Sequence, residues 1–187
     1  MNYKEELEQF VCQYPQEVED RRAMLALFEK EKDAVLRRSN ALAHVTSSSM
    51  ILNSERNKIL MIFHNIYQSW AWTGGHADGE SDMLEVAMRE ACEETGIVQV
   101  KPMKNTCVSI DILNVLGHFK HGNYVNAHVH LNYAYLLEAD ESEIVQVKED
   151  ENSGVMWIPI QQIEKYVNET QMIPIYKKVL QNYIDEE

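Results

Sequence analysis

A strongly acidic segment with helical periodicity, residues 78–96, constrains this chain most. It carries seven acidic residues against one basic residue, Arg89. Asp82 is a suitable N-cap with Glu85 as its capping-box partner, and Gly96 is a suitable helix stop. Apolar and small side chains share the arc opposite the C-terminal acids: Leu84, Met88, Ala91, Cys92 and Thr95. Because such an arc is buried, we expect the helix to pack on a sheet and to leave its carboxylates facing a cleft.

Three carboxylates crowd the C-terminal end of this helix, where the macrodipole disfavours anions by up to about 1 kcal/mol each. Glu90, Glu93 and Glu94 fall on one side of the helix and repel one another. A divalent cation would remove that penalty, and hard oxygen ligands favour Mg²⁺, with Mn²⁺ as a substitute. The alternative interpretation is an acidic face in contact with solvent.

Composition limits the classes of function. The chain has 187 residues and a formal net charge of −13, so one domain with a helical extension is expected and nucleic-acid binding is disfavoured. The longest apolar run, residues 59–63, is too short for a membrane span. Acidic residues near the N-terminus argue against a secretory signal, and three widely spaced cysteines are typical of reduced thiols. We therefore expect a cytoplasmic protein without membrane or nucleic-acid partners.

The order of elements predicts an α/β protein. Helices are expected at 3–14, at 15–38 with a break near Asp33, and at 81–95, 159–167 and 174–183. Strands are expected at 44–53, 58–63, 97–100, 107–116, 128–137 and 155–158. Strands with helices between and after them predict a mixed sheet covered by helices.

Residues 75–97, GHADGESDMLEVAMREACEETGI, resemble the Nudix box, Gly-x5-Glu-x7-Arg-Glu-U-x-Glu-Glu-x-Gly-U. Eight of its nine defined positions match, and Ser81 stands where the family usually has its first Glu. The turn Trp72-Thr73-Gly74-Gly75 and the passage at 155–160 also look like a Nudix domain. In the family the Glu at this position often supports the loop and the Arg, so the resemblance implies either that Ser81, Glu80 or Asp82 takes over the support of the loop and Arg89, or that this support is lost.

The resemblance implies the Nudix fold, a mixed β-sheet sandwiched between α-helices, at residues 44–187. Residues 1–43 are then an N-terminal helical extension, which could cover the cleft, pack on the back of the domain or form a homodimer contact. The implied activity is that of a pyrophosphohydrolase. Such an enzyme uses Mg²⁺ to hydrolyse a nucleoside diphosphate linked to another moiety, so its partner is a small anionic nucleotide-type substrate.

The resemblance also implies residue roles. Glu90 and Glu94 are the first choices as metal ligands, and Glu93 is either a third ligand or a group that activates water. Arg89 is expected to orient a neighbouring Glu. The family often takes a general base from a distal loop, which makes Glu149 or Glu151 a further catalytic candidate.

Histidines form a second group of candidates. His128, His130 and Asn132 alternate along one strand and share one face, whereas Val129 and Leu131 share the other. With His76 in the loop before the acidic helix, these histidines could line a pocket that binds phosphate, a base or a second metal. The alternative is that they are core residues with hydrogen-bond partners in the fold.

Two other functions compete. An isopentenyl diphosphate isomerase of the same superfamily takes a metal ligand from a Gly-His step, as in Gly75-His76, but it needs a catalytic Cys just before that step, where this chain has Gly74. A non-catalytic Nudix-like sensor usually loses the metal glutamates, which are intact here. Both alternatives are therefore less favoured than the hydrolase.

Overall fold

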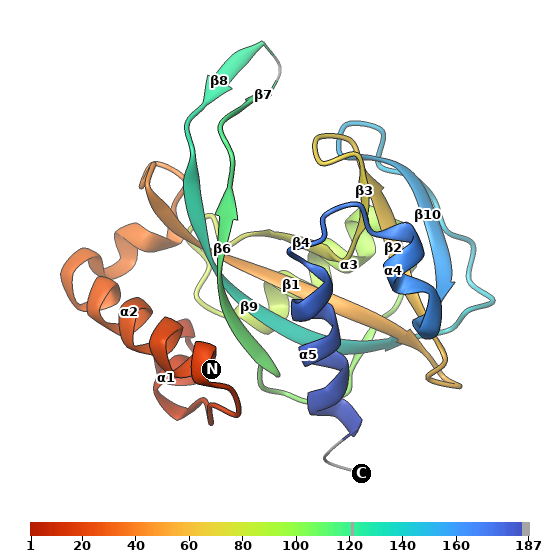
Figure 1. Cartoon of the computed structure of the whole chain (residues 1–187), viewed down its shortest axis with the longest axis horizontal. Helices are drawn as coiled ribbons and strands as arrows, with labels where there is room; N and C mark the ends of the chain where they lie inside the picture. The colour runs from red at the N-terminus through yellow and green to blue at the C-terminus, as the bar shows by residue number, and fades with distance from the viewer. Residues whose placement is uncertain (121, 185–187) are drawn as a thin grey trace.

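The computed structural model describes residues 1–120 and 122–184 and shows a mixed sheet between helices (Figure 1). The strand order is β10, β2, β1, β9, β5, with β3 on β2, β4 on β1 and β6 on β9. The strands are β1 Ala43–Asn53, β2 Lys58–His64, β3 Ser69–Ala71, β4 Thr73–His76, β5 Lys101–Pro102, β6 Ser109–Val115, β9 His128–Ala139 and β10 Asn152–Pro159. Only β1 and β9 pair in parallel among these strands. A separate hairpin joins β7 His118–Lys120 to β8 Asn123–Val125.

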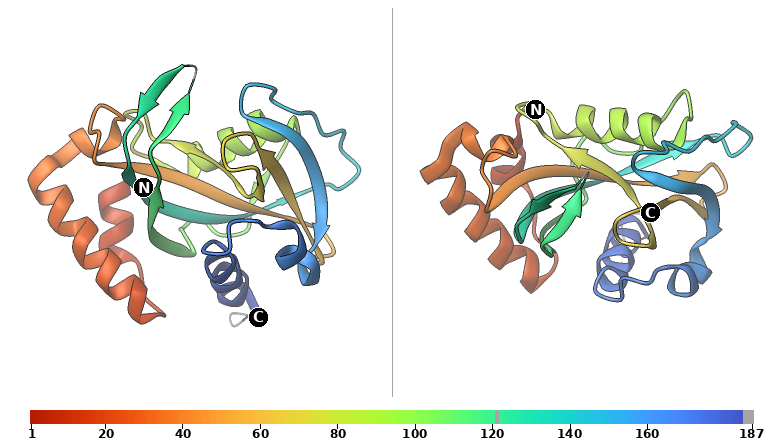
Figure 2. Two further views of the ribbon diagram at one scale, coloured as in Figure 1. Left: turned by 45° about the horizontal axis from the view of Figure 1, so that its top comes forward. Right: turned by 90° about the horizontal axis from the view of Figure 1, so that it is seen from above.

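Helices cover both faces of the sheet (Figure 2). The helices are α1 Tyr3–Gln9, α2 Pro15–Glu31, α3 Met83–Thr95, α4 Ile163–Tyr166 and α5 Ile173–Ile184, with 3₁₀ turns at Lys32–Leu36 and Ile160–Gln162. One buried cluster joins α1, α2 and α3 to the sheet, and a second joins α4 and α5 to its opposite face. The predicted α/β class and the mixed sheet between helices are confirmed.

The pairing of β1 with β9 brings two polar half-strands together. In parallel register His44 lies opposite His130 and Thr46 opposite Asn132. Farther along the same face the side chains become apolar, and Met50 and Leu136 pack in the cluster under α5. Because side chains alternate along a strand, this face of β1 and β9 has a polar end and an apolar end.

The N-terminal helices share the core of the domain. Buried side chains of α1 and α2, among them Leu7 and Phe28, belong to the same cluster as α3. The buried Glu6 carboxylate accepts hydrogen bonds from the Cys107 amide and the Tyr135 hydroxyl, both at 2.6 Å. These contacts hold the helices against the sheet. The domain boundary predicted between residues 43 and 44 stays a prediction.

Three predicted elements differ clearly from the structure, and one of them, the helix predicted at 159–167, is a 3₁₀ turn at Ile160–Gln162 followed by the short helix α4. The first helix ends at Gln9, because the Arg21 guanidinium on α2 donates a hydrogen bond to the Leu7 carbonyl at 2.8 Å and another to the Glu8 carbonyl. Residues 97–100 are not a strand, because the Val98 amide donates to the Glu143 carboxylate at 2.7 Å and its side chain is 88% exposed. By contrast, the predicted break near Asp33 is confirmed, since α2 gives way to a 3₁₀ turn at Lys32.

Across the described ranges 1–120 and 122–184, no helix has both the length and the apolar composition needed to cross a bilayer.

Candidate active site

Helix α3 carries the acidic cluster and is anchored at both ends. The Asp82 carboxylate accepts the Glu85 amide at 3.3 Å, and Gly96, at φ 74°, donates its amide to the Cys92 carbonyl at 2.9 Å. A left-handed residue ends a helix in this way, and glycine adopts that conformation at little cost. The predicted N-cap at Asp82 and stop at Gly96 are therefore confirmed, whereas the predicted capping-box contact of the Glu85 side chain is not observed among the described residues.

The buried face of α3 only partly matches the predicted one, since Ala91 and Thr95 of the predicted arc are fully buried and the other three residues are not. Leu84, Met88 and Cys92 are only partly buried, whereas the fully buried side chains are Met83, Val86, Ala87, Ala91, Glu94 and Thr95. The helix is turned so that its packing face includes Glu94, because β4 and the sheet receive that side of the helix. One of the three clustered carboxylates is consequently removed from solvent.

Glu94 is held by the backbone around it. Its side chain is 3% exposed, and its Oε2 accepts the Gly74 amide at 2.9 Å. Its own carbonyl accepts the Asn152 side-chain amide from β10 at 2.9 Å. Burial raises the pKa of Glu94 well above its usual range, and the nearby Glu151 and Glu90 carboxylates raise it further. A cation beside Glu94 would reverse this effect by stabilising the ionised carboxylate.

Arg89 connects the other acids of the cluster. Its Nη2 lies 2.8 Å from Glu90 Oε1, its Nη1 pairs with Glu80, and its Nε lies 3.7 Å from Glu93 Oε1. Glu80 thus makes the contact with Arg89 that we expected from Ser81, Glu80 or Asp82. The Ser81 carbonyl instead accepts the Tyr3 amide at 2.8 Å. Arg89 therefore has the geometry of a positioning residue for carboxylates.

The distal loop brings one acid to the cluster. Lys148 Nζ lies 3.3 Å from a Glu93 oxygen and 3.3 Å from a Glu151 oxygen. Glu149 is exposed, and its carbonyl accepts the Asn65 side chain. Of the two candidates in this loop, the structure brings Glu151 next to the carboxylates of α3.

Two observations indicate that the carboxylates of α3 could hold a hard divalent cation. Glu94 is a buried carboxylate that borders a cavity, and Gly75 leaves room for the Glu90 carboxylate. A Cβ at Gly75 would lie 2.3 Å from Glu90 Cδ, so only glycine fits there without a shift. Carboxylate oxygens are the ligands that Mg²⁺ prefers.

Replacing Gly75 by Ala is expected to displace the Glu90 carboxylate and to weaken Mg²⁺ binding by about 10–100-fold, the usual effect of disturbing the support of a ligand. Ser81→Ala, which alters an exposed side chain in the loop before α3, should leave affinity unchanged. Isothermal titration with Mg²⁺ measures both. Wild-type affinity in Gly75→Ala would show that Glu90 is not a ligand.

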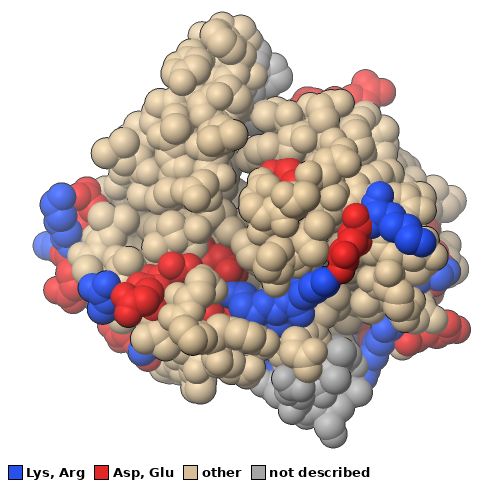
Figure 3. Space-filling view, viewed as in Figure 1, with Lys and Arg blue, Asp and Glu red and all other residues tan. Residues whose placement is uncertain are grey.

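A cavity of about 420 Å³ lies beside this cluster, on the α5 side of the sheet. Figure 3 shows that face hollowed next to the β7–β8 hairpin, with acidic atoms at the edge of the hollow. Glu94, Gly74 and Gly75 border the cavity on one side, and Trp72 and Tyr176 supply apolar surface. The Glu94 carboxylate therefore borders a space large enough for a small molecule.

Six of the described histidines border the cavity, and four of them lie close together. The predicted residues His76, His128 and His130 all border it, and His44 joins them from β1. His128 Nε2 lies 3.2 Å from His130 Nε2, and the His44 ring centroid lies 4.8–5.1 Å from those of the other three. His44 was not among the predicted site residues, although the alternation of His44, Thr46 and Ser48 along β1 has the same period as the predicted polar face of β9.

The chain matches the model of the NUDIX domain over residues 43–183. It therefore belongs to the Nudix family, and its enzyme class is that of the Nudix-type pyrophosphohydrolases. Comparison with curated proteins finds no match.

Several solved structures have a similar fold. A C. elegans Ap4A hydrolase in a binary complex is 17% identical, with a TM-score of 0.54 over 76% of this chain and 98% of that chain. RenU, a Nudix hydrolase from M. smegmatis, is 12% identical, with a TM-score of 0.57 over 77% and 88%. The NUDIX domain of Shewanella oneidensis NrtR, complexed with ADP ribose, is 12% identical, with a TM-score of 0.56 over 84% and 97%. At these identities the likeness shows the fold.

Proposed function

We propose that this protein is an Mg²⁺-dependent hydrolase that cleaves the diphosphate linkage of a nucleoside diphosphate joined to another moiety. The observation that carries the proposal is the buried Glu94 carboxylate, which borders the cavity at the acidic end of α3. The fold neighbours complexed with ADP ribose or named as Ap4A hydrolases support a ligand of the same class.

Glu90, Glu93 and Glu94 would hold the ion. The ion would supply positive charge that neutralises the diphosphate and polarises the P–O bond, which would help a chain of net charge −13 to admit an anion. Arg89 positions Glu90 through its 2.8 Å ion pair. Glu93 and Glu151, on either side of Lys148, are the candidates for the base that accepts a proton from water.

The cavity supplies groups that would bind substrate. Asn132 Oδ1 is within hydrogen-bond distance of the Thr46 and Ser48 hydroxyls, at 3.0 and 2.8 Å, and its buried Nδ2 has no hydrogen-bond partner among the described residues. A buried donor without a partner costs about 1–3 kcal/mol, so a ligand oxygen at this position would be favoured. His76, His128 and His130 border the same space.

The two alternative functions have less support. Among the described residues that border the cavity there is no cysteine, which the isomerase would need. The three carboxylates that a non-catalytic sensor usually loses are all present on α3. The homodimer and the cytoplasmic location stay predictions.

The test is a panel of diphosphate compounds that includes ADP-ribose, dinucleoside polyphosphates, nucleotide sugars and coenzymes, each incubated with the full chain and Mg²⁺. Phosphate-sensitive detection and product mass should identify one class that is cleaved between the two phosphorus atoms. Chelation should abolish cleavage, and added Mg²⁺ or Mn²⁺ should restore it. Failure to cleave any member, or cleavage unaffected by chelator, would contradict the proposal.

A further inference from the structure

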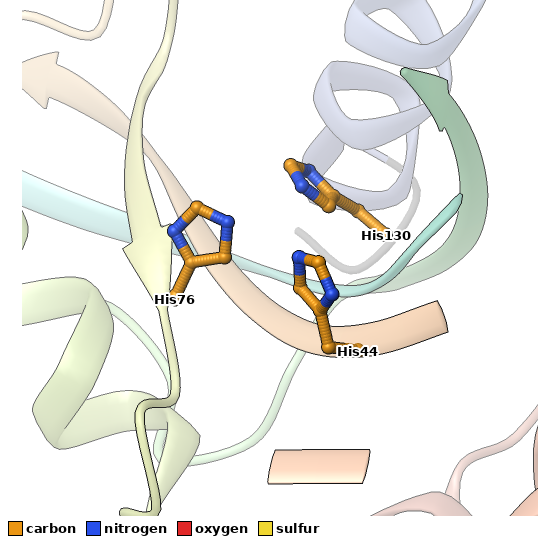
Figure 4. A group of neighbouring side chains, drawn as sticks. All are labelled: His44, His76 and His130. Carbon is orange, nitrogen blue, oxygen red and sulfur yellow. The ribbon is translucent and has the colours of Figure 1, made fainter. Parts of the chain in front are cut away.

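The histidines lie on three different strands whose registers bring them together. His44 on β1 lies opposite His130 on β9, and His76 on β4 lies opposite Thr46, two residues along β1. One possible ligand atom from each of His44, His76 and His130 lies within 4.8 Å of the other two. Figure 4 shows the three rings directed toward a common space. Three separate strands therefore supply a compact group of nitrogen donors.

The hydrogen bonds of His44 leave one nitrogen available. His44 Nδ1 lies 3.1 Å from the Asn40 carbonyl, which can only accept, so Nδ1 carries the proton and Nε2 carries a lone pair. The side chain is 4% exposed, and Nε2 is buried without a hydrogen-bond partner among the described residues. An acceptor buried in this way costs free energy unless it binds a proton donor or a cation.

His128 supports the neighbouring ring. Its Nδ1 lies 2.8 Å from the Asn126 carbonyl, so its Nε2 is an acceptor, and that nitrogen lies 3.2 Å from His130 Nε2. If His130 donates this Nε2 proton, its Nδ1 carries a lone pair. A hydrogen bond to the far nitrogen of an imidazole is the usual way in which a metal-binding histidine is oriented.

The charged form is disfavoured in two of these rings. Burial first, and then the neighbouring His76, His44 and His128 rings, lower the pKa of His130 to about 2. Burial also lowers the pKa of His44.

We propose that His44, His76 and His130 form a second metal centre, for a transition-metal ion of the Zn²⁺ class, with His128 as the positioning residue. Imidazole nitrogen is a ligand of Zn²⁺ and other transition metals, whereas Mg²⁺ takes oxygen. Three protein ligands leave a fourth position of a tetrahedral zinc site open. Since the histidines border the cavity, that position would take a water or an anionic oxygen of the ligand.

This centre would lie next to the carboxylate site but use different ligands. Gly75 precedes His76 in β4 and lies against the Glu90 carboxylate, so the two sites meet across one strand. Metal binding by the histidines does not require hydrolytic activity. The histidine centre and the hydrolase activity can therefore be tested independently of each other.

The test is Zn²⁺ binding to the full chain after chelator treatment and dialysis, followed by calorimetry with Zn²⁺ alone. We expect one tight site in the wild type. His44→Asn, His76→Asn and His130→Asn should each weaken it at least about 100-fold, because each removes a ligand. The Glu90→Gln/Glu94→Gln double variant should retain it, as should His118→Gln, which alters another cavity histidine outside the group.

Co²⁺ provides a spectroscopic readout of the same site. Visible absorption of a four-coordinate centre is expected in the wild type and in the Glu90→Gln/Glu94→Gln variant, and it should disappear in His76→Asn, whose side chain is only half-buried. X-ray absorption of the Zn²⁺-loaded wild type should count three imidazoles and does not depend on any variant folding. Fewer than two imidazoles, no tight site, or binding lost with the carboxylates and kept in His76→Asn would overturn the proposal.

Discussion

Replacing Glu94 by Gln is expected to lower kcat at least about 100-fold, because a bound metal contributes several kcal/mol to the transition state. The Gln amide oxygen can still accept the Gly74 amide, so the 2.9 Å hydrogen bond that positions this side chain is kept. The variant replaces the second carboxylate oxygen by an NH2 group, which can neither ionise nor bind a metal ion. Steady-state kinetics on the substrate found in the panel, with titrated Mg²⁺, measures the effect.

The stability of the same variant separates a loss of metal from a loss of fold. Folding raises the pKa of Glu94 chiefly through burial, so the ionised form is disfavoured in the metal-free fold. Glu94→Gln should therefore unfold at a urea concentration equal to or above that of the wild type. Glu85→Gln, an exposed position in the first turn of α3, is the matched control and should keep both activity and stability. Wild-type turnover in Glu94→Gln would show that this carboxylate is not a metal ligand.

Replacing Lys178 by Met is expected to cost about 3–5 kcal/mol of unfolding free energy, the usual result of removing one partner from a buried ion pair. Lys178 on α5 lies 2.7 Å from Asp111 Oδ1 on β6 and 3.2 Å from Glu17 Oε1 on α2. All three side chains are buried or nearly so. Without the ammonium group, two buried carboxylates would face each other with no countercharge, and urea denaturation should show the loss.

Lys177→Met is the control for this prediction. Lys177 is the adjacent residue of α5 and pairs with Glu164, but both side chains are more than half exposed, so its loss should cost at most about 1 kcal/mol. Adding Glu17→Gln and Asp111→Asn to Lys178→Met should recover part of the lost stability, because the unpaired charges are then removed. Equal stabilities for the two lysine variants would show that the network does not hold α2, β6 and α5 together.

The sequence predicted elements whose pattern is local. The cap at Asp82, the stop at Gly96 and the alternating face of β9 each depend on residues within a few positions, so their chemistry is visible in the chain. The end of the first helix and the strand at 97–100 were predicted wrongly, because Arg21 and Glu143, which are distant in the sequence, form hydrogen bonds with backbone groups there. Long-range side-chain contacts of this kind leave no local pattern.

The candidate site was predictable in part for the same reason. Glu90, Glu93 and Glu94 were found because crowded anions at a helix end are unfavourable without a cation, and this is a property of one segment. The rotation of α3 about its axis, which buries Glu94, was not predictable, because it depends on how the helix packs against β4 and the sheet. Neither was the pairing of Glu80 with Arg89, which depends on the path of the loop.

By itself, then, the sequence determined the acidic helix, its likeness to the Nudix box and the polar face of β9. Tertiary structure decided which carboxylate is buried, which distal acid reaches the cluster, and that His44 joins His76 and His130. Strand register is the physical reason, since a shift of one residue between β1 and β9 would turn His44 to the opposite face. The register is specified by the whole apolar interior under α5 and α3, and no short stretch of sequence contains it.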